Sequence, residues 1–313
     1  MPQIVIAEFM DEAAIREGLA GFDVLYDASL VDAPDALAAA LVDAEALIVR
    51  NRTQVRGPLL DAAPKLRAVG RLGVGLDNID VEACEKRGIA VFPATGANDV
   101  SVAEYVIATA LMLLRGAYFA TAEVTAGAWP RNKLMGREIA GKRLGLVGFG
   151  AIAKETGQRA AALGMSVAAY DPFVPADSAA WRQPWGTITP LALDALLAEA
   201  DVVSLHVPLT PETRNLIDAK ALAGMKPDAV LINAARGGVV DEAALAGALR
   251  AGKLGGGALD VFESEPLRAD RGAIFQGCPN LILTPHIAGV TVESNVRVSR
   301  VTVEAVAKHL RGA

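Results

Sequence analysis

The sequence predicts an α/β protein in which two domains each contain a doubly wound parallel sheet. Short apolar runs alternate with alanine-rich helical stretches, which is the spacing of βαβ units. The composition is 52% hydrophobic but only 5% aromatic, so Ala, Val, Ile and Leu supply the strands, as in sheets covered by helices on both faces. A length of 313 residues corresponds to roughly two domains of about 150 residues each.

The first series of strands and helices fills about the first hundred residues. Apolar runs predict strands at 4–9, 46–50, 66–71 and 89–93. Helical stretches lie between them, around 11–20, 34–42 and 79–87. A longer helix begins near the sequence NDVSVAE, whose Asn, Asp and Ser side chains can cap its first amides, and runs to about Phe119.

The second series follows a loop that contains Trp129 and Pro130. Its strands are predicted at 143–150, 165–171, 201–208, 229–235, 256–262 and 280–285, and a last helix at about 291–310. No Gly/Ser linker separates the two series, so we expect helices to form the domain boundaries. One domain then consists of residues 1–97 plus 288–313, and the other of residues 98–287.

Charge, hydropathy and cysteine content argue against several classes of protein. A net charge of −6 with interspersed signs differs from the basic stripe of nucleic-acid-binding surfaces. The longest apolar run, residues 105–114, is far shorter than the roughly 20 residues of a membrane-spanning helix. Cys84 and Cys278 have no metal-binding spacing, and the N-terminus has no basic signal-peptide region. We expect a cytoplasmic protein with no metal, no membrane partner and no nucleic-acid partner.

A dinucleotide-binding fingerprint lies between the predicted strand at 143–150 and the helix after it. Gly148 allows the tight turn, Gly150 lets the backbone approach a pyrophosphate, and Ala153 lets the helix pack closely on the strand. The amides of Ala151 and Ile152 would point at the phosphates from the helix N-terminus. A glycine-rich turn without a ligand is the alternative for this motif alone.

An acidic residue at the expected distance strengthens the dinucleotide interpretation. Asp171 ends the next predicted strand, 21 residues after Gly150, where a carboxylate binds the ribose hydroxyls of the adenosine. That carboxylate would repel a 2′-phosphate, and no arginine follows within residues 171–180. The pattern therefore favours NAD over NADP.

Three segments that end predicted strands of the second series carry polar residues, on the side where open α/β sheets bind ligands. These residues are Arg236, Asp260, Glu265 and His286. Each has an ordinary alternative: Arg236 as a surface residue at a helix start, Asp260 as a structural residue, Glu265 as a solvated loop acid, and His286 as a cap of the sheet edge. The common position of Arg236, Glu265 and His286 at strand ends favours a catalytic site over these alternatives.

With these motifs, the sequence closely resembles the D-isomer-specific 2-hydroxyacid dehydrogenases, and in particular their phosphoglycerate dehydrogenase branch. The segments that carry the resemblance are 71–80, 98–111, 129–153 and 205–217. It covers nearly the whole chain and implies two Rossmann-like domains with the active site in the cleft between them. Residues 1–97 plus 288–313 would form a flavodoxin-like substrate domain, and residues 98–287 the NAD-binding domain.

The resemblance implies a role for each catalytic candidate. His286 would be the acid/base, Glu265 its partner, and Arg236 the residue that binds the carboxylate and carbonyl of the substrate. A histidine titrates near neutrality and suits proton transfer in both directions. Arginine offers a planar, permanently charged fork for an α-keto carboxylate. The resemblance also places a further set of residues at the cofactor, namely His206, Ala234, Arg236, Asp260, His286 and Gly289.

A cation near the expected substrate site predicts a substrate that has a second anionic group besides its carboxylate. Backbone amides of Val74 and Gly75 would hold the substrate carboxylate, as implied by the resemblance. The loop at 49–55 has the substrate-contacting position of the family, and Arg52 adds a cation there. A phosphate, sulfonate or carboxylate at C3 of the substrate would pair with Arg52. A solvated surface arginine is the alternative.

Several functions remain open within this interpretation. The sequence ends 27 residues after His286, so we expect no extra C-terminal regulatory domain of the kind that many phosphoglycerate dehydrogenases have. The loop and the compact length resemble the bacterial sulfolactate dehydrogenases of this family. We therefore expect 3-sulfolactate first and 3-phosphoglycerate second. Reduction of glyoxylate or hydroxypyruvate, and a nonenzymatic NADH-binding corepressor, are the alternatives. The resemblance further implies a homodimer formed around residues 129–135.

Overall fold

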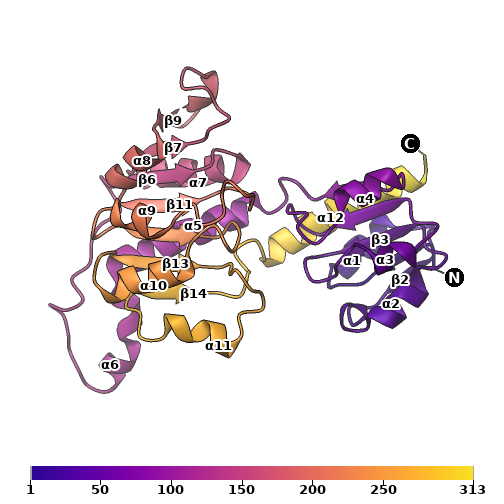
Figure 1. Ribbon diagram of the computed structural model, residues 1–313, viewed down its shortest axis with the longest axis horizontal. Helices are drawn as coiled ribbons and strands as arrows, with labels where there is room; N and C mark the ends of the chain where they lie inside the picture. The colour runs from indigo at the N-terminus through magenta and orange to yellow at the C-terminus, as the bar shows by residue number, and fades with distance from the viewer. Residues whose placement is uncertain (1, 313) are drawn as a thin grey trace. The chain divides into compact units, whose positions relative to one another are not determined.

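Two parallel sheets form the framework of the protein, whose computed structural model describes residues 2–312 (Figure 1). The chain divides into two units, the first up to Asn98 and from Val290 onward, and the second over Asp99–Gly289. The boundaries expected from the sequence, after residues 97 and 287, lie one and two residues earlier. The first of these boundaries falls at the start of a long helix, α5.

The first unit contains a five-stranded sheet in the order β2-β1-β3-β4-β5. Its strands are β1 (Ile4–Ile6), β2 (Val24–Tyr26), β3 (Ala46–Val49), β4 (Ala68–Arg71) and β5 (Ala90–Pro93). Its helices are α1 (Glu12–Gly18), α2 (Pro34–Leu41), α3 (Pro58–Asp61), α4 (Val81–Lys86) and α12 (Val292–Leu310). All four strand pairings are parallel, as the alternation of strands and helices predicts.

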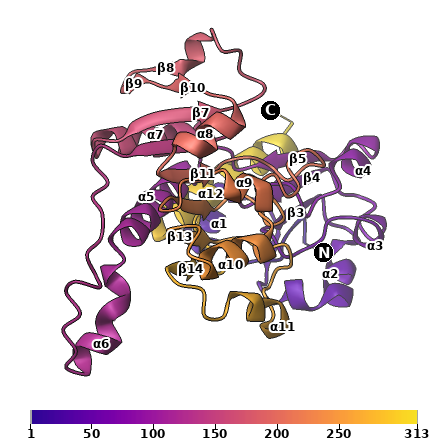
Figure 2. The same cartoon turned by 60° about the vertical axis from the view of Figure 1, so that its left-hand side comes forward.

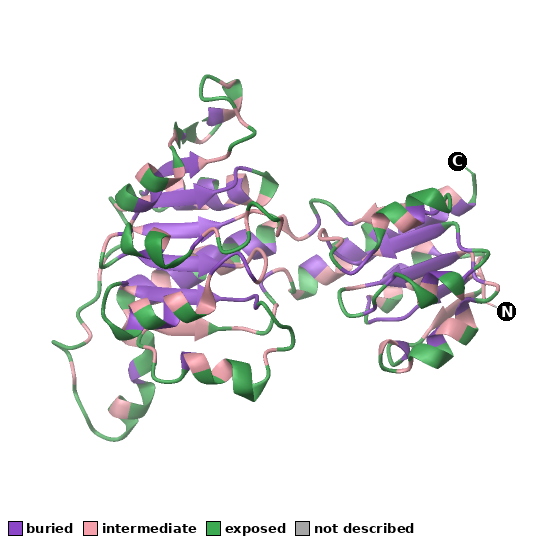
Figure 3. Cartoon of the chain, in the orientation of Figure 1, coloured by how far each residue is buried: buried purple, intermediate pink, exposed green. Residues whose placement is uncertain are grey.

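Alternating side chains of these strands enter two separate cores. Ile4 and Ile48 belong to a cluster with residues of α1 and α12, whereas Val5 and Leu47 belong to one with residues of α2, α3 and α4. Because successive residues of a strand face opposite sides of the sheet, a sheet covered on both faces needs apolar residues at every position. The central strands β1 and β3 are buried along their whole length, whereas the edge strands β2 and β5 are only partly buried (Figure 3).

The last helix of the chain, α12, packs on the first unit. Its start has a reciprocal capping box in which Thr291 and Ser294 satisfy each other's backbone amides. At Gly70 of β4, a Cβ atom would lie 2.7 Å from the Cγ2 atom of Thr302 and 2.9 Å from that of Val306. The close approach of α12 to the sheet therefore requires glycine at position 70.

The second unit contains a seven-stranded sheet in the order β10-β7-β6-β11-β12-β13-β14. The strands are β6 (Arg143–Val147), β7 (Ser166–Tyr170), β10 (Thr189–Pro190), β11 (Val202–Leu205), β12 (Val230–Asn233), β13 (Gly256–Leu259) and β14 (Leu281–Leu283). The chain runs outward from β6 to β7 and then returns to add β11 on the other side of β6. The strand order thus reverses at β6, where open α/β sheets bind their ligands.

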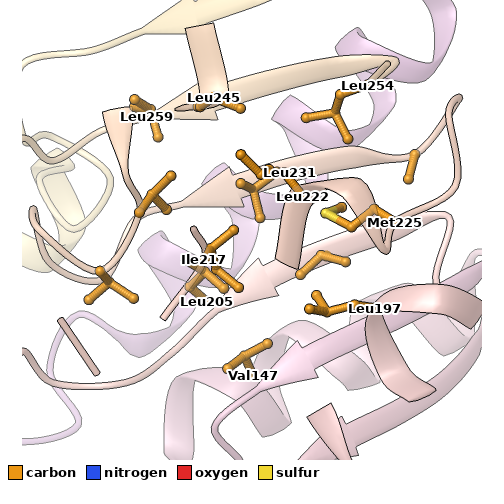
Figure 4. Packing of buried hydrophobic residues seen from close by; sticks show 14 of the residues in the cluster. Val147, Leu197, Leu205, Ile217, Leu222, Met225, Leu231, Leu245, Leu254 and Leu259 are labelled. Atoms are coloured by element: carbon orange, nitrogen blue, oxygen red, sulfur yellow. The ribbon is translucent and has the colours of Figure 1, made fainter. Parts of the chain in front are cut away.

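Helices cover both faces of this second sheet. The helices of this unit are α5 (Asp99–Arg115), α6 (Thr121–Thr125), α7 (Ala151–Ala162), α8 (Leu193–Glu199), α9 (Ala219–Ala223), α10 (Glu242–Arg250) and α11 (Ala269–Gly272). Val147, Leu205, Leu231 and Leu259 point into the core beneath α8, α9 and α10 (Figure 4). The segment that carries α6 projects away from the rest of this unit (Figures 1 and 2).

Several elements differ from the sequence-based prediction. The helix expected to reach Phe119 ends at Arg115, because Gly116 takes a left-handed conformation with φ of 61° and starts a short 3-10 turn. The prediction missed the edge strand β2, the one-turn helix α3, strand β10 and the antiparallel pair β8 (Arg182–Gln183) and β9 (Gly186–Thr187). These elements have two to four residues, too few for a periodic pattern.

The long apolar helix α5 belongs to the second unit. Val106, Ala110, Leu113 and Leu114 are buried in its core. Over residues 2–312, no single helix has both the length and the hydropathy to cross a membrane. Helix α5 passes that test only together with residues 117–125, and the two parts are bent by 67°.

Candidate active site

The turn between β6 and α7 has the geometry of a dinucleotide cradle. Gly148 has φ of 91°, and a Cβ there would lie 2.5 Å from the carbonyl oxygen of His206. Gly150 is exposed, and a Cβ there would meet nothing within 4 Å. Gly150 caps α7 without a side-chain hydrogen bond, so the amides of Ala151 and Ile152 at the helix start face no capping side chain. A close-packed glycine followed by an open one fits a bound pyrophosphate.

Asp171 lies directly after β7 and is held beside this turn. Its Oδ2 atom accepts a hydrogen bond from the amide of Phe149 at 2.9 Å, and its Oδ1 atom accepts one from the amide of Phe173 at 2.9 Å. A carboxylate oxygen has more than one lone pair, so both oxygens can still accept bonds from ribose hydroxyls. The residues present therefore fit NAD.

His206 follows β11 on the other side of the switch point. Its amide donates to the carbonyl oxygen of Val147 at 2.7 Å, and its Nε2 atom lies 2.9 Å from Oγ of Ser204. Burial lowers the pKa of His206 to about 4. The ring is therefore neutral at physiological pH and is unsuited to acid/base work there.

A histidine and a carboxylate form the reactive pair of the second unit. His286 Nδ1 lies 2.7 Å from Oε2 of Glu265, and both side chains are about one-third exposed. Oε1 of Glu265 accepts a hydrogen bond from the amide of Phe262 at 3.0 Å. Burial alone would raise the pKa of Glu265. The hydrogen bond and charge of His286, the Phe262 amide and the charge of Arg236 together outweigh it and lower that pKa.

The backbone of His286 adopts a conformation that is unusual for a residue with a side chain. Its φ is 57°, in the left-handed region. Strand β14 ends at Leu283, so Thr284 and Pro285 separate the strand from His286, which does not cap the sheet edge directly. The amide of His286 donates to the carbonyl oxygens of Asp260 at 2.8 Å and Thr284 at 3.1 Å. Such a conformation persists only where surrounding contacts fix it.

Asp260 supplies those contacts. It is only 1% exposed. Its Oδ1 atom accepts from Oγ1 of Thr284 at 2.6 Å and from the amide of Ile287 at 2.8 Å. Its Oδ2 atom accepts from the amide of Ala288 at 2.7 Å. The hydroxyl of Tyr105 on α5 lies 2.7 Å from Oγ1 of Thr284 and extends the network. Asp260 thus ties together the loop that presents His286.

Arg236 lies in the turn after β12, the strand next to β13. Its Nη1 atom donates to the carbonyl oxygen of Ala235 at 2.6 Å, and its own carbonyl oxygen accepts from Nδ2 of Asn233 at 2.9 Å. The next helix, α10, begins only at Glu242, so the alternative of an arginine at a helix start is wrong. A Cβ at Gly237 would lie 1.8 Å from the carbonyl oxygen of Phe262, so this turn packs tightly against the loop that carries Glu265.

The two remaining predicted cofactor residues are Ala234, at the carboxyl edge of the second sheet, and Gly289, at the end of the second unit. Ala234 directly follows β12 and is half-buried, and Gly289 is the last residue of the unit. The structure brings Arg236, Glu265 and His286 to the carboxyl ends of the neighbouring strands β12, β13 and β14. Over residues 2–312, no cluster of three or more His, Cys, Asp or Glu side chains is arranged to hold a metal ion.

In the first unit, the predicted carboxylate-binding amides lie in the loop after β4. Val74 and Gly75 are both half-buried there. Gly73 precedes them with φ of 144°, and a Cβ on it would lie 1.6 Å from Nη1 of Arg71. Nη1 of Arg71 donates to the carbonyl oxygen of Leu72 at 3.1 Å. The guanidinium of Arg71 therefore shapes this loop, and only glycine fits at position 73.

Arg52 lies in the loop after β3, the strand next to β4. Its Nη1 atom is 3.3 Å from Oδ2 of Asp32, and its Nη2 atom forms an ion pair with Oδ1 of the same residue. Both side chains are mostly exposed, and such pairs contribute little stability. Loss of the pairing with Asp32 would therefore cost little stability. Sequence reasoning missed Asp32, because it lies 20 positions before Arg52 and no motif links the two residues.

Sequence reasoning also missed Arg50, the first residue of this loop. Its Nη2 atom donates to Oδ1 of Asn295 at 2.5 Å, and its guanidinium lies 5.8 Å from the ring centre of Phe9. Burial lowers the pKa of Arg50, and the charge of Glu8 opposes that effect. The loop thus carries two arginines, one partly buried and one exposed.

Comparison with known proteins agrees with this geometry. Residues 107–288 match the family described as "D-isomer specific 2-hydroxyacid dehydrogenase, NAD binding domain". The (S)-sulfolactate dehydrogenase of Chromohalobacter salexigens is 57% identical over 311 residues, which cover 99% of both chains. The D-3-phosphoglycerate dehydrogenase of Mycobacterium tuberculosis is 41% identical over the whole chain, which spans 57% of that relative.

Solved structures show the same fold. A D-lactate dehydrogenase from Aquifex aeolicus, complexed with NAD and lactic acid, superposes with a TM-score of 0.86 at 31% identity. The match covers 99% of this chain and 96% of that one. The family expected from the motifs is therefore confirmed, together with the reaction class and the cofactor. The chain belongs to the D-isomer specific 2-hydroxyacid dehydrogenases and is an NAD-dependent oxidoreductase of that family.

Proposed function

We propose that this enzyme interconverts (S)-3-sulfolactate and 3-sulfopyruvate, with the His286–Glu265 pair as its acid/base. The hydrogen bond of 2.7 Å between Nδ1 of His286 and Oε2 of Glu265 carries the catalytic part of the proposal. The carboxylate keeps a proton on Nδ1 and leaves Nε2 for the substrate. In oxidation, Nε2 accepts the hydroxyl proton of the substrate, and the resulting imidazolium is stabilised by Glu265. In reduction, Nε2 returns that proton to the carbonyl oxygen.

The cofactor and the substrate carboxylate have their own sets of residues. NAD, when bound, supplies the acceptor for the hydride that leaves C2. Gly148, Gly150, Ala151 and Ile152 would hold its pyrophosphate, and Asp171 its ribose. His206, Ala234, Asp260 and Gly289 would line the same cofactor site. Arg236, with Val74 and Gly75, would bind the carboxylate and carbonyl of the substrate and orient C2.

Arg52 would recognise the sulfonate. Its guanidinium is exposed and paired with Asp32, so an anion that binds there exchanges one ion pair for another. The relative from Chromohalobacter, which shares 57% of the sequence over nearly its full length, supports sulfolactate as the substrate. A second candidate is 3-phosphoglycerate, because an arginine fork binds phosphate as well as sulfonate and the mycobacterial relatives act on that acid.

A substrate panel tests this proposal. We expect kcat/KM to be highest for sulfolactate among sulfolactate, 3-phosphoglycerate, glycerate and lactate. Arg52→Ala should raise KM for sulfolactate by about tenfold or more, as expected for loss of a charge-assisted contact. Arg16→Ala, which removes an exposed arginine of α1 from an ion pair with Glu12, is the matched control and should leave KM unchanged. Highest efficiency with lactate, together with an Arg52→Ala variant like wild type, would contradict the proposal.

We also propose that the enzyme is a cytoplasmic homodimer. Tyr118, Trp129 and Met135 on the projecting segment are 61%, 76% and 80% exposed, and exposed apolar clusters of this kind are typical of interfaces. Both cysteines are free, in keeping with a reducing compartment. Size-exclusion chromatography with light scattering should give twice the chain mass, and Trp129→Asp should shift the protein to the monomer. A wild-type monomer at micromolar concentration would contradict the homodimer.

A further inference from the structure

A buried carboxylate of the first unit holds the backbone of the arginine loop. Glu8, just after β1, is only 4% exposed. Its Oε1 atom accepts from the amides of Arg50 at 2.9 Å and Thr53 at 3.0 Å, and its Oε2 atom accepts from the amide of Arg52 at 3.3 Å. One side chain therefore binds three amides of the four-residue loop at 50–53.

These contacts explain how a carboxylate is tolerated at this position. Burying a carboxylate is costly unless hydrogen bonds replace its water. Three amide donors do so, and bonds from amides to an ionised acceptor are stronger than those to a neutral one. Because Glu8 occupies these amides, a substrate anion cannot use them. Recognition at this loop must come from side chains, whose position depends on the backbone that Glu8 fixes.

Asn78 binds the backbone carbonyl groups of the same loop. It is 5% exposed, and its Nδ2 atom donates to the carbonyl oxygens of Thr53 at 2.7 Å and Arg50 at 3.3 Å. The backbone carbonyl oxygen of Asn78 accepts a hydrogen bond from the amide of Val55 at 2.8 Å. Two buried side chains, one just after β1 and one shortly before α4, thus fix both the donors and the acceptors of one loop.

We propose that Glu8 and Asn78 are positioning residues that set the selectivity for the distal anion by holding Arg52 in place. Neither residue contacts the reacting atoms. The inference rests on the proposed role of Arg52 in the function above. A guanidinium at the end of a flexible arm of three methylene groups gains affinity only if its backbone is already ordered, since ordering on binding subtracts from affinity.

The test begins with Glu8→Gln, which keeps the size but exchanges one accepting oxygen for a donor that faces backbone amides. We expect KM for sulfopyruvate to rise by about tenfold, the scale of one lost charge-assisted bond. The Kd for NADH should stay unchanged. Asn78→Asp removes the amide donor from the other side of the loop and should raise the same KM. Glu45→Gln is the matched control. Glu45 lies just before β3, and its side chain contacts Gln3 and Arg67 rather than the loop at 50–53.

A double variant separates positioning from general stability. If Glu8 acts through Arg52, then Glu8→Gln should add little to the KM of Arg52→Ala, because the two changes remove the same contact. Fully additive effects, or an unchanged KM in a Glu8→Gln variant with wild-type melting temperature, would overturn the inference. Should Glu8→Gln fail to fold, Glu8→Asp and Asn78→Asp provide the same comparison.

The outcome also distinguishes this inference from the proposed function. A wild-type enzyme that prefers 3-phosphohydroxypyruvate to sulfopyruvate would contradict the sulfolactate proposal before any variant is made. The same KM comparison, carried out with the preferred anionic keto acid, would then still test Glu8 and Asn78. If the Glu8 and Asn78 variants then had the same KM as wild type for that substrate, the positioning role would be contradicted.

Discussion

Single residues of the same type have different chemistry in this enzyme because their surroundings differ. His206 is neutral, since burial lowers its pKa to about 4, whereas His286 faces a carboxylate whose own pKa is lowered by the pairing. A paired and ionised Glu265 favours the imidazolium that forms when His286 takes a proton. We therefore expect the two histidines to differ in role, with His206 lining the cofactor site and His286 transferring protons.

The buried His206 makes stability depend on pH. Its folded pKa of about 4 is below the ordinary value of 6.5, so the unfolded chain binds the proton more readily. The resulting stability is fully present above pH 6.5 and is lost as the pH falls from 6.5 through about 4. His206→Gln should flatten the fall in the free energy of unfolding over this range, measured by urea denaturation. Parallel curves for the two proteins would rule out this contribution.

At the level of elements, Thr284 after β14 and Asp260 after β13 together hold the loop that carries His286. Thr284→Val keeps the shape of the side chain but leaves Oδ1 of Asp260 without its hydroxyl donor and the hydroxyl of Tyr105 without that partner. We expect a loss of about 1–3 kcal/mol in the free energy of unfolding, and a reduced kcat with an unchanged NADH Kd. Tyr105→Phe, which removes only the outer hydroxyl, should have a smaller effect on kcat. Equal kcat values for wild type and Thr284→Val would contradict the role of this network.

We expect the βαβ element that carries the fingerprint to set the cofactor preference. Asp171→Ala removes the carboxylate that repels a 2′-phosphate and also frees the amides of Phe149 and Phe173. We expect the ratio of kcat/KM for NAD to that for NADP to fall by about tenfold or more. Unchanged selectivity would place the cofactor preference on another residue.

The sequence predicted most strands and helices of both sheets and the fingerprint, because these depend on local patterns. The strand ends were expected a few residues too late, as at residue 208 for β11, which ends at Leu205. Contacts between remote residues could not be predicted in this way. Glu8 and Thr53 are 45 positions apart, and Tyr105 and Thr284 are 179 apart. The left-handed backbone of His286 also has no local signal, since its neighbours include no glycine turn.

At the scale of the whole molecule, the two units carry different parts of the expected site. The second unit holds the fingerprint, Arg236 and the His286–Glu265 pair, whereas the first holds the arginine loop and the loop after β4. Both sets lie at carboxyl ends of parallel strands. We therefore expect changes in the two loops of the first unit to alter substrate selectivity while the reaction type stays the same.

In the proposed reaction, His286 transfers the proton while NAD accepts the hydride. The most direct test follows NADH absorbance with sulfopyruvate for wild type, His286→Ala and the control His309→Ala on α12. We expect His286→Ala to lower kcat by about 10²–10⁴-fold, the usual contribution of positioned acid/base catalysis, with NADH Kd and melting temperature unchanged. His309→Ala should match wild type. Turnover by His286→Ala within a few-fold of wild type would contradict the claim.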